Sequence, residues 1–276
     1  MVLLRSINSP QQFINTSNFQ ARFFTNFGCI EDGFNPKDYL FSASPMANAS
    51  VDNADVSIKK WFKEISNQST LSSCVGNGVA DAFEAQFAHR NNLDPNKVDN
   101  ISRLFIYWNS RNNDTPPCAN VDKGTRIRLA FDCMARYGAP SEDLYPYDIA
   151  KVNERPTILA YREAIKHRIS AFYRIDKTGD DRIIQIIQAL NAGNPIVFGT
   201  ALGTSFRYIN SDAIVNLPND AIIGRHCMII VSWSSSRQAF EIRNSWGEGW
   251  GVGGYCWMSP SYLTASITSD LWVPTI

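Results

Sequence analysis

The sequence has no excess of charge of either sign and no long hydrophobic run. Lys plus Arg and Asp plus Glu both number 26 among 276 residues, which gives a formal net charge of zero. A neutral chain argues against nucleic acid as the main partner, because binding to phosphates requires a basic surface. No apolar run approaches membrane-spanning length, and the few apolar residues after Met1 are too short for a signal-peptide core.

The spacing of the six cysteines does not support a disulfide framework. Small secreted scaffolds need bridges because their cores are small, whereas 44% of this chain is hydrophobic and a large core is expected. Cys227 and Cys256 lie in strongly apolar runs, where a buried free thiol is the ordinary state. We therefore predict six reduced cysteines and a protein that is cytoplasmic, or exported without a cleavable signal peptide.

Histidine is scarce, with three in the chain. His89 and His167 stand among charged and polar neighbours and are predicted to lie at the surface. His226 opens an apolar, strand-like run, so it needs a polar partner if it is buried. Taken alone, His226 is better explained as a core histidine.

Three further segments carry side chains that can react or form specific hydrogen bonds. Cys74 starts a helix-like run, and a helix N-terminus favours the thiolate, the form that attacks a carbonyl carbon. Gln68 lies six residues before it, and the string Asn-Ser-Trp-Gly-Glu-Gly-Trp-Gly starts at Asn244. An asparagine oxygen can accept from an imidazole and fix its tautomer. A structural cysteine and a glycine-rich turn are the simpler explanations of these segments when each is taken alone.

The chain order Gln68, Cys74, His226, Asn244 resembles the papain-like cysteine peptidases, over roughly residues 57–272. The resemblance implies that Cys74 is the nucleophile, His226 the general base and then acid, and Asn244 the group that orients the imidazole. Gln68 would be an oxyanion donor together with the backbone N–H of Cys74.

The same resemblance implies a role for two supporting residues and departs from the family pattern in others. Trp246 would cover the hydrogen bond between His226 and Asn244, and Gly124 would line the substrate groove. Leu71 stands where secreted relatives carry a bridged cysteine. We expect no metal ion and no cofactor, and a protein or peptide substrate; the sequence does not determine the oligomeric state.

The predicted fold is α+β with two lobes: a helical lobe that carries Cys74, a β-rich lobe that carries His226 and Asn244, and a cleft between them. Residues 1–57 are predicted to be an extended leader that wraps residues 58–276, with the helical lobe at 58–170 and the β lobe at 171–276. Hydrophobic periodicity and turn residues predict helices from Cys74 to at least Phe87 and at 102–111, 125–137, 156–167 and 180–190, with Asp180 as an N-cap, and strands at 196–199, 226–233, 239–243 and 254–258.

Arg225 precedes His226, and on a strand its side chain would point to the opposite face. It either reaches the rim of the cleft, where it would attract acidic substrates, or bonds to a nearby carbonyl.

The leading function is an endopeptidase; a deamidase or transferase using the same thioester, and a catalytically silent binding module, are the alternatives. Because the leader has no long amphipathic helix to fill the cleft, we expect it not to be a strong inhibitor.

Overall fold

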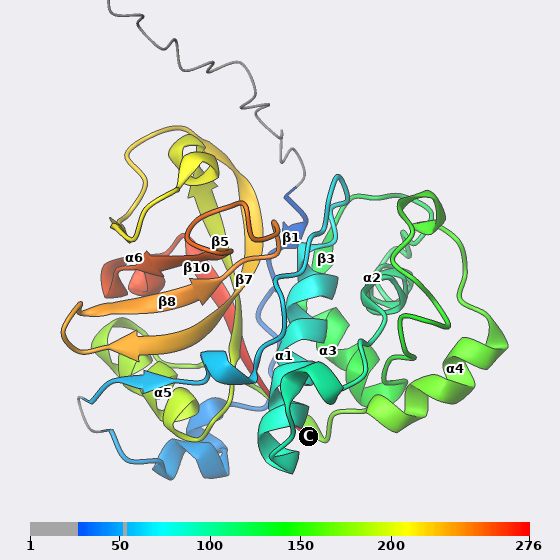
Figure 1. The fold of residues 1–276 in the computed structure, drawn as a ribbon, viewed down its shortest axis with the longest axis horizontal. Helices are drawn as coiled ribbons and strands as arrows, with labels where there is room; N and C mark the ends of the chain where they lie inside the picture. The colour runs from blue at the N-terminus through cyan, green and yellow to red at the C-terminus, as the bar shows by residue number, and fades with distance from the viewer. Residues whose placement is uncertain (1–26, 52–53) are drawn as a thin grey trace, which may run out of the picture.

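The computed structural model describes residues 27–51 and 54–276, and its helices and strands gather into two halves (Figure 1). Helices α1–α4 lie on the right in Figure 1, and the large sheet lies on the left. The helices are α1 Cys74–Asn91, α2 Arg103–Asn112, α3 Ile127–Arg136, α4 Ile158–Ala164, α5 Gly179–Asn191 and α6 Pro260–Thr264. The strands are β1 Cys29–Ile30, β2 Val56–Ser57, β3 Thr125–Arg126, β4 Ala171–Arg174, β5 Ile196–Gly203, β6 Ile214–Val215, β7 Ile222–Ser234, β8 Ala239–Arg243, β9 Tyr255–Met258 and β10 Thr268–Thr275.

The large sheet has the strand order β4-β10-β5-β7-β8-β9-β6, and β2 pairs with β7 outside this path. All of its pairings are antiparallel except that of β6 with β9. The long strand β7 starts exposed at Ile222 and is buried from His226 to Ser234. An antiparallel sheet with its helices largely in a separate layer is an α+β architecture, as the sequence predicts.

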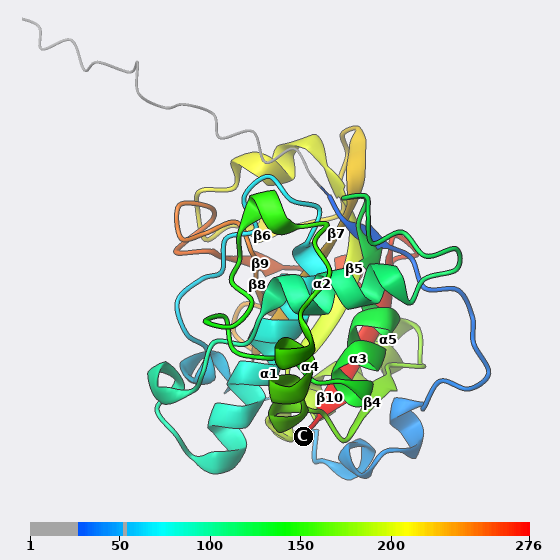
Figure 2. The ribbon, with the colours of Figure 1, turned by 90° about the vertical axis from the view of Figure 1, so that its right-hand side faces the viewer.

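Helix α1 is buried along most of its length and packs against both halves (Figure 2). Its two glycines explain how it comes so close to its neighbours. A Cβ on Gly76 would lie 2.8 Å from the Arg103 carbonyl oxygen on α2, and one on Gly78 would lie 3.2 Å from Cys227 Sγ on β7. Glycine therefore lowers helix propensity at these two positions but permits contact with both halves of the molecule.

The predicted helices and strands are all present, but several of them begin or end at other residues than predicted. Helix α3 begins at Ile127 because the two residues before it pair with β1. Helix α4 ends at Ala164 and continues as a 3₁₀ turn to His167. The predicted N-cap of α5 is wrong: Thr178 occupies that position, and Asp180 lies in the first turn, where the helix dipole favours an acidic side chain.

The described part of the predicted leader contacts both halves of the fold. Strand β1 pairs in parallel with β3 on the helical side, and β2 pairs with β7 in the large sheet. Residues 1–26 and 52–53 lie outside the described residues. The predicted boundary at residue 57 lies within β2, and the division of the chain into leader and domain stays a prediction.

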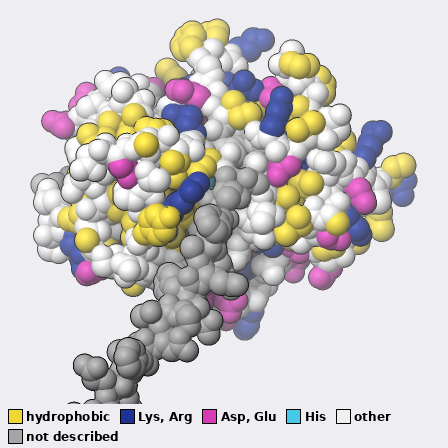
Figure 3. Space-filling model, turned by 90° about the horizontal axis from the view of Figure 1, so that it is seen from above, with side chains coloured by type: hydrophobic (Ala, Val, Ile, Leu, Met, Phe, Trp, Pro, Cys, Tyr) yellow, Lys and Arg dark blue, Asp and Glu magenta, His cyan; other side chains and the backbone are white. Residues whose placement is uncertain are grey.

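Charged side chains of both signs are interspersed on the face seen in Figure 3, without a large patch of one sign. This distribution fits the equal numbers of basic and acidic residues. Among the described helices, none has both the length and the apolar character that crossing a membrane requires.

Candidate active site

Cys74 is the first residue of α1 and is completely buried. Backbone groups of Cys227 and Gly28 face its thiol, so parts of β7 and of the leader lie beside it. Burial raises the pKa of Cys74 to about 11, against a smaller lowering by these backbone hydrogen bonds. The position at a helix N-terminus is as predicted, but the thiolate expected there is not favoured in this buried state.

His226 and Asn244 are brought together from β7 and from the residue that follows β8. His226 Nε2 and Asn244 Oδ1 are 2.7 Å apart, and both residues are buried. Asn244 Oδ1 also accepts from the N–H of Ser245, which fixes the orientation of the amide. Because an amide oxygen only accepts, Nε2 carries the proton, and Nδ1 is left buried without a hydrogen-bond partner among the described residues.

The same burial that raises the pKa of the thiol lowers the pKa of His226 to about 4, and the hydrogen bond with Asn244 opposes this shift. The imidazole is therefore neutral at physiological pH in this structure. A neutral imidazole with a free Nδ1 can accept a proton.

Trp246 lies over the imidazole. The two ring centroids are 4.6 Å apart with an interplanar angle of 33°, and Trp246 is 2% exposed. Phe206 and Trp250 pack edge-on against Trp246 at centroid distances of 5.9 and 5.5 Å. This aromatic cluster excludes water from one side of the histidine.

Gln68 is tied to the segment that carries Asn244. Its backbone N–H donates to the Ser245 carbonyl, and its Oε1 accepts from Ser245 Oγ at 2.8 Å. The side-chain Nε2 donates to the Leu71 carbonyl at 2.8 Å. These contacts hold the amide in one orientation close to the start of α1, where an oxyanion donor would be needed.

Three residues that the sequence analysis did not single out position the loop around Cys74: Tyr107, Asp122 and Tyr147. Asp122 accepts from the N–H of Ser72 and from the Tyr107 hydroxyl, and Tyr107 in turn accepts from the N–H of Gly124. The Tyr147 hydroxyl donates to the Gln68 carbonyl at 2.9 Å. Tyr147 belongs to a Tyr-Pro-Tyr string, and that string was the only sequence signal for these contacts.

Gly124 lies where a second backbone comes very close. Its φ is +90°, and a Cβ there would lie 2.4 Å from the Gly28 carbonyl oxygen. That carbonyl accepts from the N–H of Thr125 at 2.8 Å. Gly124 was predicted to line the substrate groove, but in this structure the backbone at Gly124 lies against the leader.

The leader crosses the site next to the predicted catalytic residues. The Phe27 ring lies edge-on to the His226 ring and to Trp246, with centroid distances of 6.0 Å in each case. A Cβ on Gly28 would lie 1.7 Å from the Ser72 carbonyl oxygen. An extended chain thus lies beside His226 and Trp246 without an amphipathic helix, and the expectation that the leader is not a strong inhibitor stays a prediction.

Arg225 does not contact the imidazole, since the side chains of adjacent strand residues point to opposite faces. Its Nη1 donates to the Ile267 carbonyl at 3.2 Å and its Nη2 to Ser269 Oγ at 2.5 Å. This geometry matches the second of the two alternatives for Arg225, a bond to a nearby carbonyl.

The other two histidines are half-buried rather than at the surface. His89 Nδ1 lies 3.1 Å from the Gly193 carbonyl oxygen, and His167 Nδ1 lies 2.9 Å from that of Ala139. Both serve as structural links between segments. All six cysteines are buried free thiols in the structure.

A buried thiol at a helix start, next to the strand whose histidine is held by an asparagine, on a two-part α+β fold defines a cysteine peptidase as the class of protein. Comparison with known families specifies it further: residues 47–275 match the model of the papain family cysteine proteases, so the chain belongs to the papain family. The match begins ten residues before the predicted end of the leader.

Known proteins agree with this assignment. The chain is 35% identical over 230 residues to an uncharacterized peptidase C1-like protein of Acanthamoeba polyphaga mimivirus, covering 79% of this chain and 71% of that one. The crystal structure of xylellain, a cysteine protease from Xylella fastidiosa, matches with a TM-score of 0.77 and 25% identity, covering 91% and 96% of the two chains. Procathepsin L 3 of Tenebrio molitor shares the fold, with a TM-score of 0.67 at 18% identity over 92% and 78%.

Proposed function

We propose that this papain-family cysteine peptidase is an endopeptidase that cleaves protein substrates through a thioester on Cys74. The observation that carries the proposal is the buried contact between His226 Nε2 and Asn244 Oδ1, under Trp246, with Nδ1 left unpaired. An imidazole held in this tautomer can take a proton on Nδ1.

In the first half of the reaction, His226 Nδ1 accepts the Cys74 proton and the thiolate attacks the carbonyl carbon of the scissile bond. The oxygen of the tetrahedral intermediate is held by the N–H of Cys74 and the amide of Gln68. The intermediate collapses to a thioester as the imidazolium gives its proton to the leaving amine.

In the second half, a water molecule gives a proton to His226 and adds to the thioester carbon. The second tetrahedral intermediate expels the Cys74 thiolate, which is reprotonated, and releases the carboxylic acid. The Asn244 amide holds the ring throughout, because it accepts from Nε2 in both the neutral and the protonated imidazole.

Incubation of the full chain with a denatured protein, followed by mass spectrometry, tests this function. Cleavage products with new amino termini, absent with Cys74→Ala, are the expected result. Intact substrate chains with mass shifts of deamidation or amine addition would instead establish a deamidase or transferase. An unchanged substrate under conditions that expose Cys74 to a thiol reagent would establish a silent binding module.

We further propose a cytoplasmic setting, or export without a cleavable signal peptide. The six free thiols support it, since an oxidising compartment favours disulfides.

A further inference from the structure

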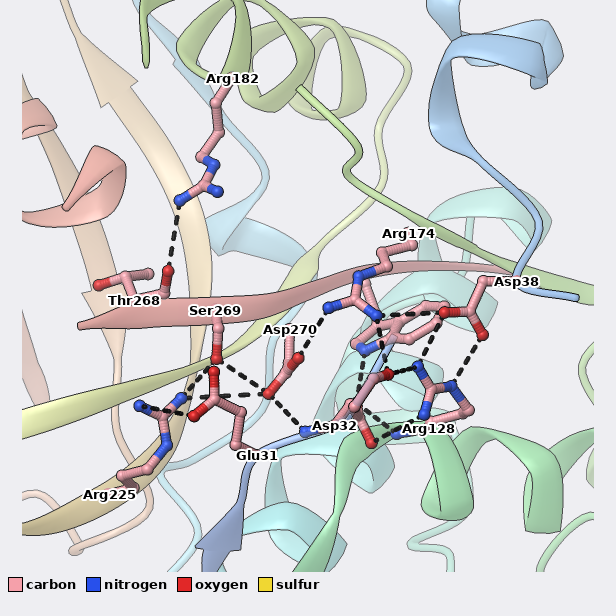
Figure 4. A network of polar contacts seen from close by, with 12 residues as sticks. Glu31, Asp32, Asp38, Arg128, Arg174, Arg182, Arg225, Thr268, Ser269 and Asp270 are labelled. Atoms are coloured by element: carbon pink, nitrogen blue, oxygen red, sulfur yellow. Dashed lines mark hydrogen bonds and ion pairs between the residues drawn. The ribbon is translucent and has the colours of Figure 1, made fainter. Parts of the chain in front are cut away.

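The leader is also held by a network of charged side chains, which includes Asp38, Arg128 and Arg174 (Figure 4). Asp38 receives two hydrogen bonds from Arg128, from Nε to Oδ1 and from Nη2 to Oδ2, each 2.8 Å long. Arg174 Nη1 donates to the same Oδ2 at 3.1 Å. One leader carboxylate is thus held between an arginine of α3 and an arginine of β4, which we call the arginine clamp.

The arginine clamp is positioned by residues outside the leader. The guanidinium carbons of Arg128 and Arg174 lie 5.4 and 5.5 Å from the centroid of the Trp272 ring, and Trp272 is fully buried. Arg174 also donates to Asp270 Oδ1 at 3.1 Å. Trp272 and Asp270 thus hold Arg174 from outside the leader, and the Trp272 ring supports Arg128, whose guanidinium hydrogen bonds go to the leader, to Asp38 and to the Gly33 carbonyl.

The charges around the clamp are not balanced without the leader. The rest of the fold contributes three guanidinium groups, those of Arg128, Arg174 and Arg225, against the carboxylates of Asp270 and of Asp132, which lies near Arg128 on α3. The leader contributes Asp38, Asp32 and the more exposed Glu31, whose Oε2 lies 4.0 Å from Arg225 Nη1. Departure of the leader would leave an excess of positive charge beside the region through which the leader reaches Cys74.

We propose that the arginine clamp is an exosite that binds acidic side chains of the protein substrate, in the place that Asp38 occupies here. This proposal rests on the proposed peptidase function. A substrate that enters the site displaces the leader, and an acidic residue on the clamp restores the bidentate, charge-assisted bonds that Asp38 made. A neutral side chain leaves Arg128 and Arg174 partly buried without the carboxylate that they share here, which costs binding free energy.

The test measures binding rather than cleavage, so its outcome does not depend on the proposed chemistry. The protein is the full chain with Cys74→Ala, to prevent turnover, and Asp38→Asn, to weaken the hold of the leader on the clamp. A labelled oligoglutamate peptide and the matched oligoglutamine peptide are titrated by fluorescence anisotropy. We expect oligoglutamate to bind roughly tenfold more tightly, equivalent to about 1.4 kcal/mol, and added salt to reduce this difference.

Two further variants show whether the clamp is responsible. Arg128→Gln with Arg174→Gln should abolish the preference for oligoglutamate. Arg182→Gln is the matched control, because Arg182 bonds the carbonyls of Leu263 and Thr268 and should keep the preference. If the double variant does not fold, Arg174→Gln alone, with a side chain 22% exposed, should reduce the preference.

Equal affinity for the two peptides, or a preference that survives loss of the clamp arginines, would overturn the exosite. A clear preference in a chain whose Cys74 form cleaves no protein would uphold the exosite and reject the peptidase function. The two proposals can therefore fail separately.

Discussion

At the scale of single residues, Cys74 and His226 are both uncharged in this structure. Burial raises the pKa of the thiol to about 11 and lowers that of the imidazole to about 4. Between these values neither group carries a charge while the leader lies beside them. Entry of water on leader departure reduces both desolvation costs, and a thiolate–imidazolium pair then becomes accessible.

The first prediction separates the roles of three residues. In protein with the leader displaced, Cys74→Ala should abolish cleavage, and His226→Ala should lower kcat/KM by about 10²–10⁴, the usual contribution of general acid–base catalysis. Asn244→Ala should cost less, because Asn244 orients the ring and exchanges no proton. Peptide cleavage kinetics measure all three, with His167→Gln as a control outside the site. Full activity in His226→Ala would rule out this mechanism.

The second prediction concerns the cysteines. Alkylation of the denatured, unreduced protein should add six labels, since all six thiols are free in the structure. In the native protein their burial should make labelling slow. Two or four blocked cysteines in protein prepared from its natural setting would contradict a reducing compartment.

At the scale of elements, the sequence predicted most of the helical half and the strands that carry His226 and Asn244. Helix α1 and strands β5, β7, β8 and β9 have strong apolar patterns bounded by Gly, Pro or Ser. Strand β10 was missed because Pro274 and Asp270 weaken its pattern. Pairing with β4 and β5 on its two sides stabilises it nevertheless, and such long-range partners are not visible in a single sequence.

The candidate site shows the same limit. Gln68, Cys74, His226, Asn244 and Trp246 could be named from local strings. The structure brings His226 against Asn244 and Trp246, joins Gln68 to Ser245, and places Cys74 beside the backbone of Cys227. The leader contact could not be predicted, because β1 is two residues long and has no pattern of its own. It forms through long-range contacts, among them the close approach of Gly28 to Ser72 and Gly124 and the packing of Phe27 against His226.

The third prediction tests the leader as an intramolecular plug. Gly28→Val places a branched side chain where a Cβ would already lie 1.7 Å from the Ser72 carbonyl oxygen, so the leader must move away. Labelling of Cys74 by an active-site epoxide should therefore be faster in full-length Gly28→Val than in the unaltered chain. Labelling that requires His226 occurs only in a correctly folded site. A gain in labelling that is lost in His226→Ala therefore cannot come from misfolding.

Gly33→Ala is the matched control for this experiment. A Cβ at Gly33 meets no atom within 4 Å, and its backbone is not in the left-handed region, so the rate should not change. Equal labelling rates for the unaltered chain and for Gly28→Val would show that the leader does not limit access to Cys74.

At the scale of the whole molecule, the leader joins the two halves through a network that responds to pH. Asp32 accepts at Oδ2 from Trp272 Nε1 and from the N–H of Arg128, and its own N–H donates to Asp270 Oδ2. Arg128 lies 3.7 Å from Asp32 Oδ1 and is also paired with Asp38. Arg174 and Arg225 both lie close to Asp270.

Burial, followed by the nearby Asp270, raises the pKa of Asp32 to about 7. Burial also raises the pKa of Asp270. A carboxyl whose pKa is higher in the docked than in the free leader favours docking when it is protonated. The contribution of Asp32 to docking is therefore fully present below its ordinary value near 4 and is lost as pH rises through about 7.

The fourth prediction follows from this weakening of leader docking as pH rises. Hydrogen exchange of the β1 amides should become faster relative to those of β7 as pH rises from mildly acidic to mildly basic, after correction for intrinsic exchange. Asp32→Asn removes the titrating group and should flatten this dependence, whereas Asp94→Asn, in a separate exposed turn, should not. A leader held more tightly at the basic end would mean that the ion pair with Arg128, and not the cost of burying the Asp32 charge, governs its docking.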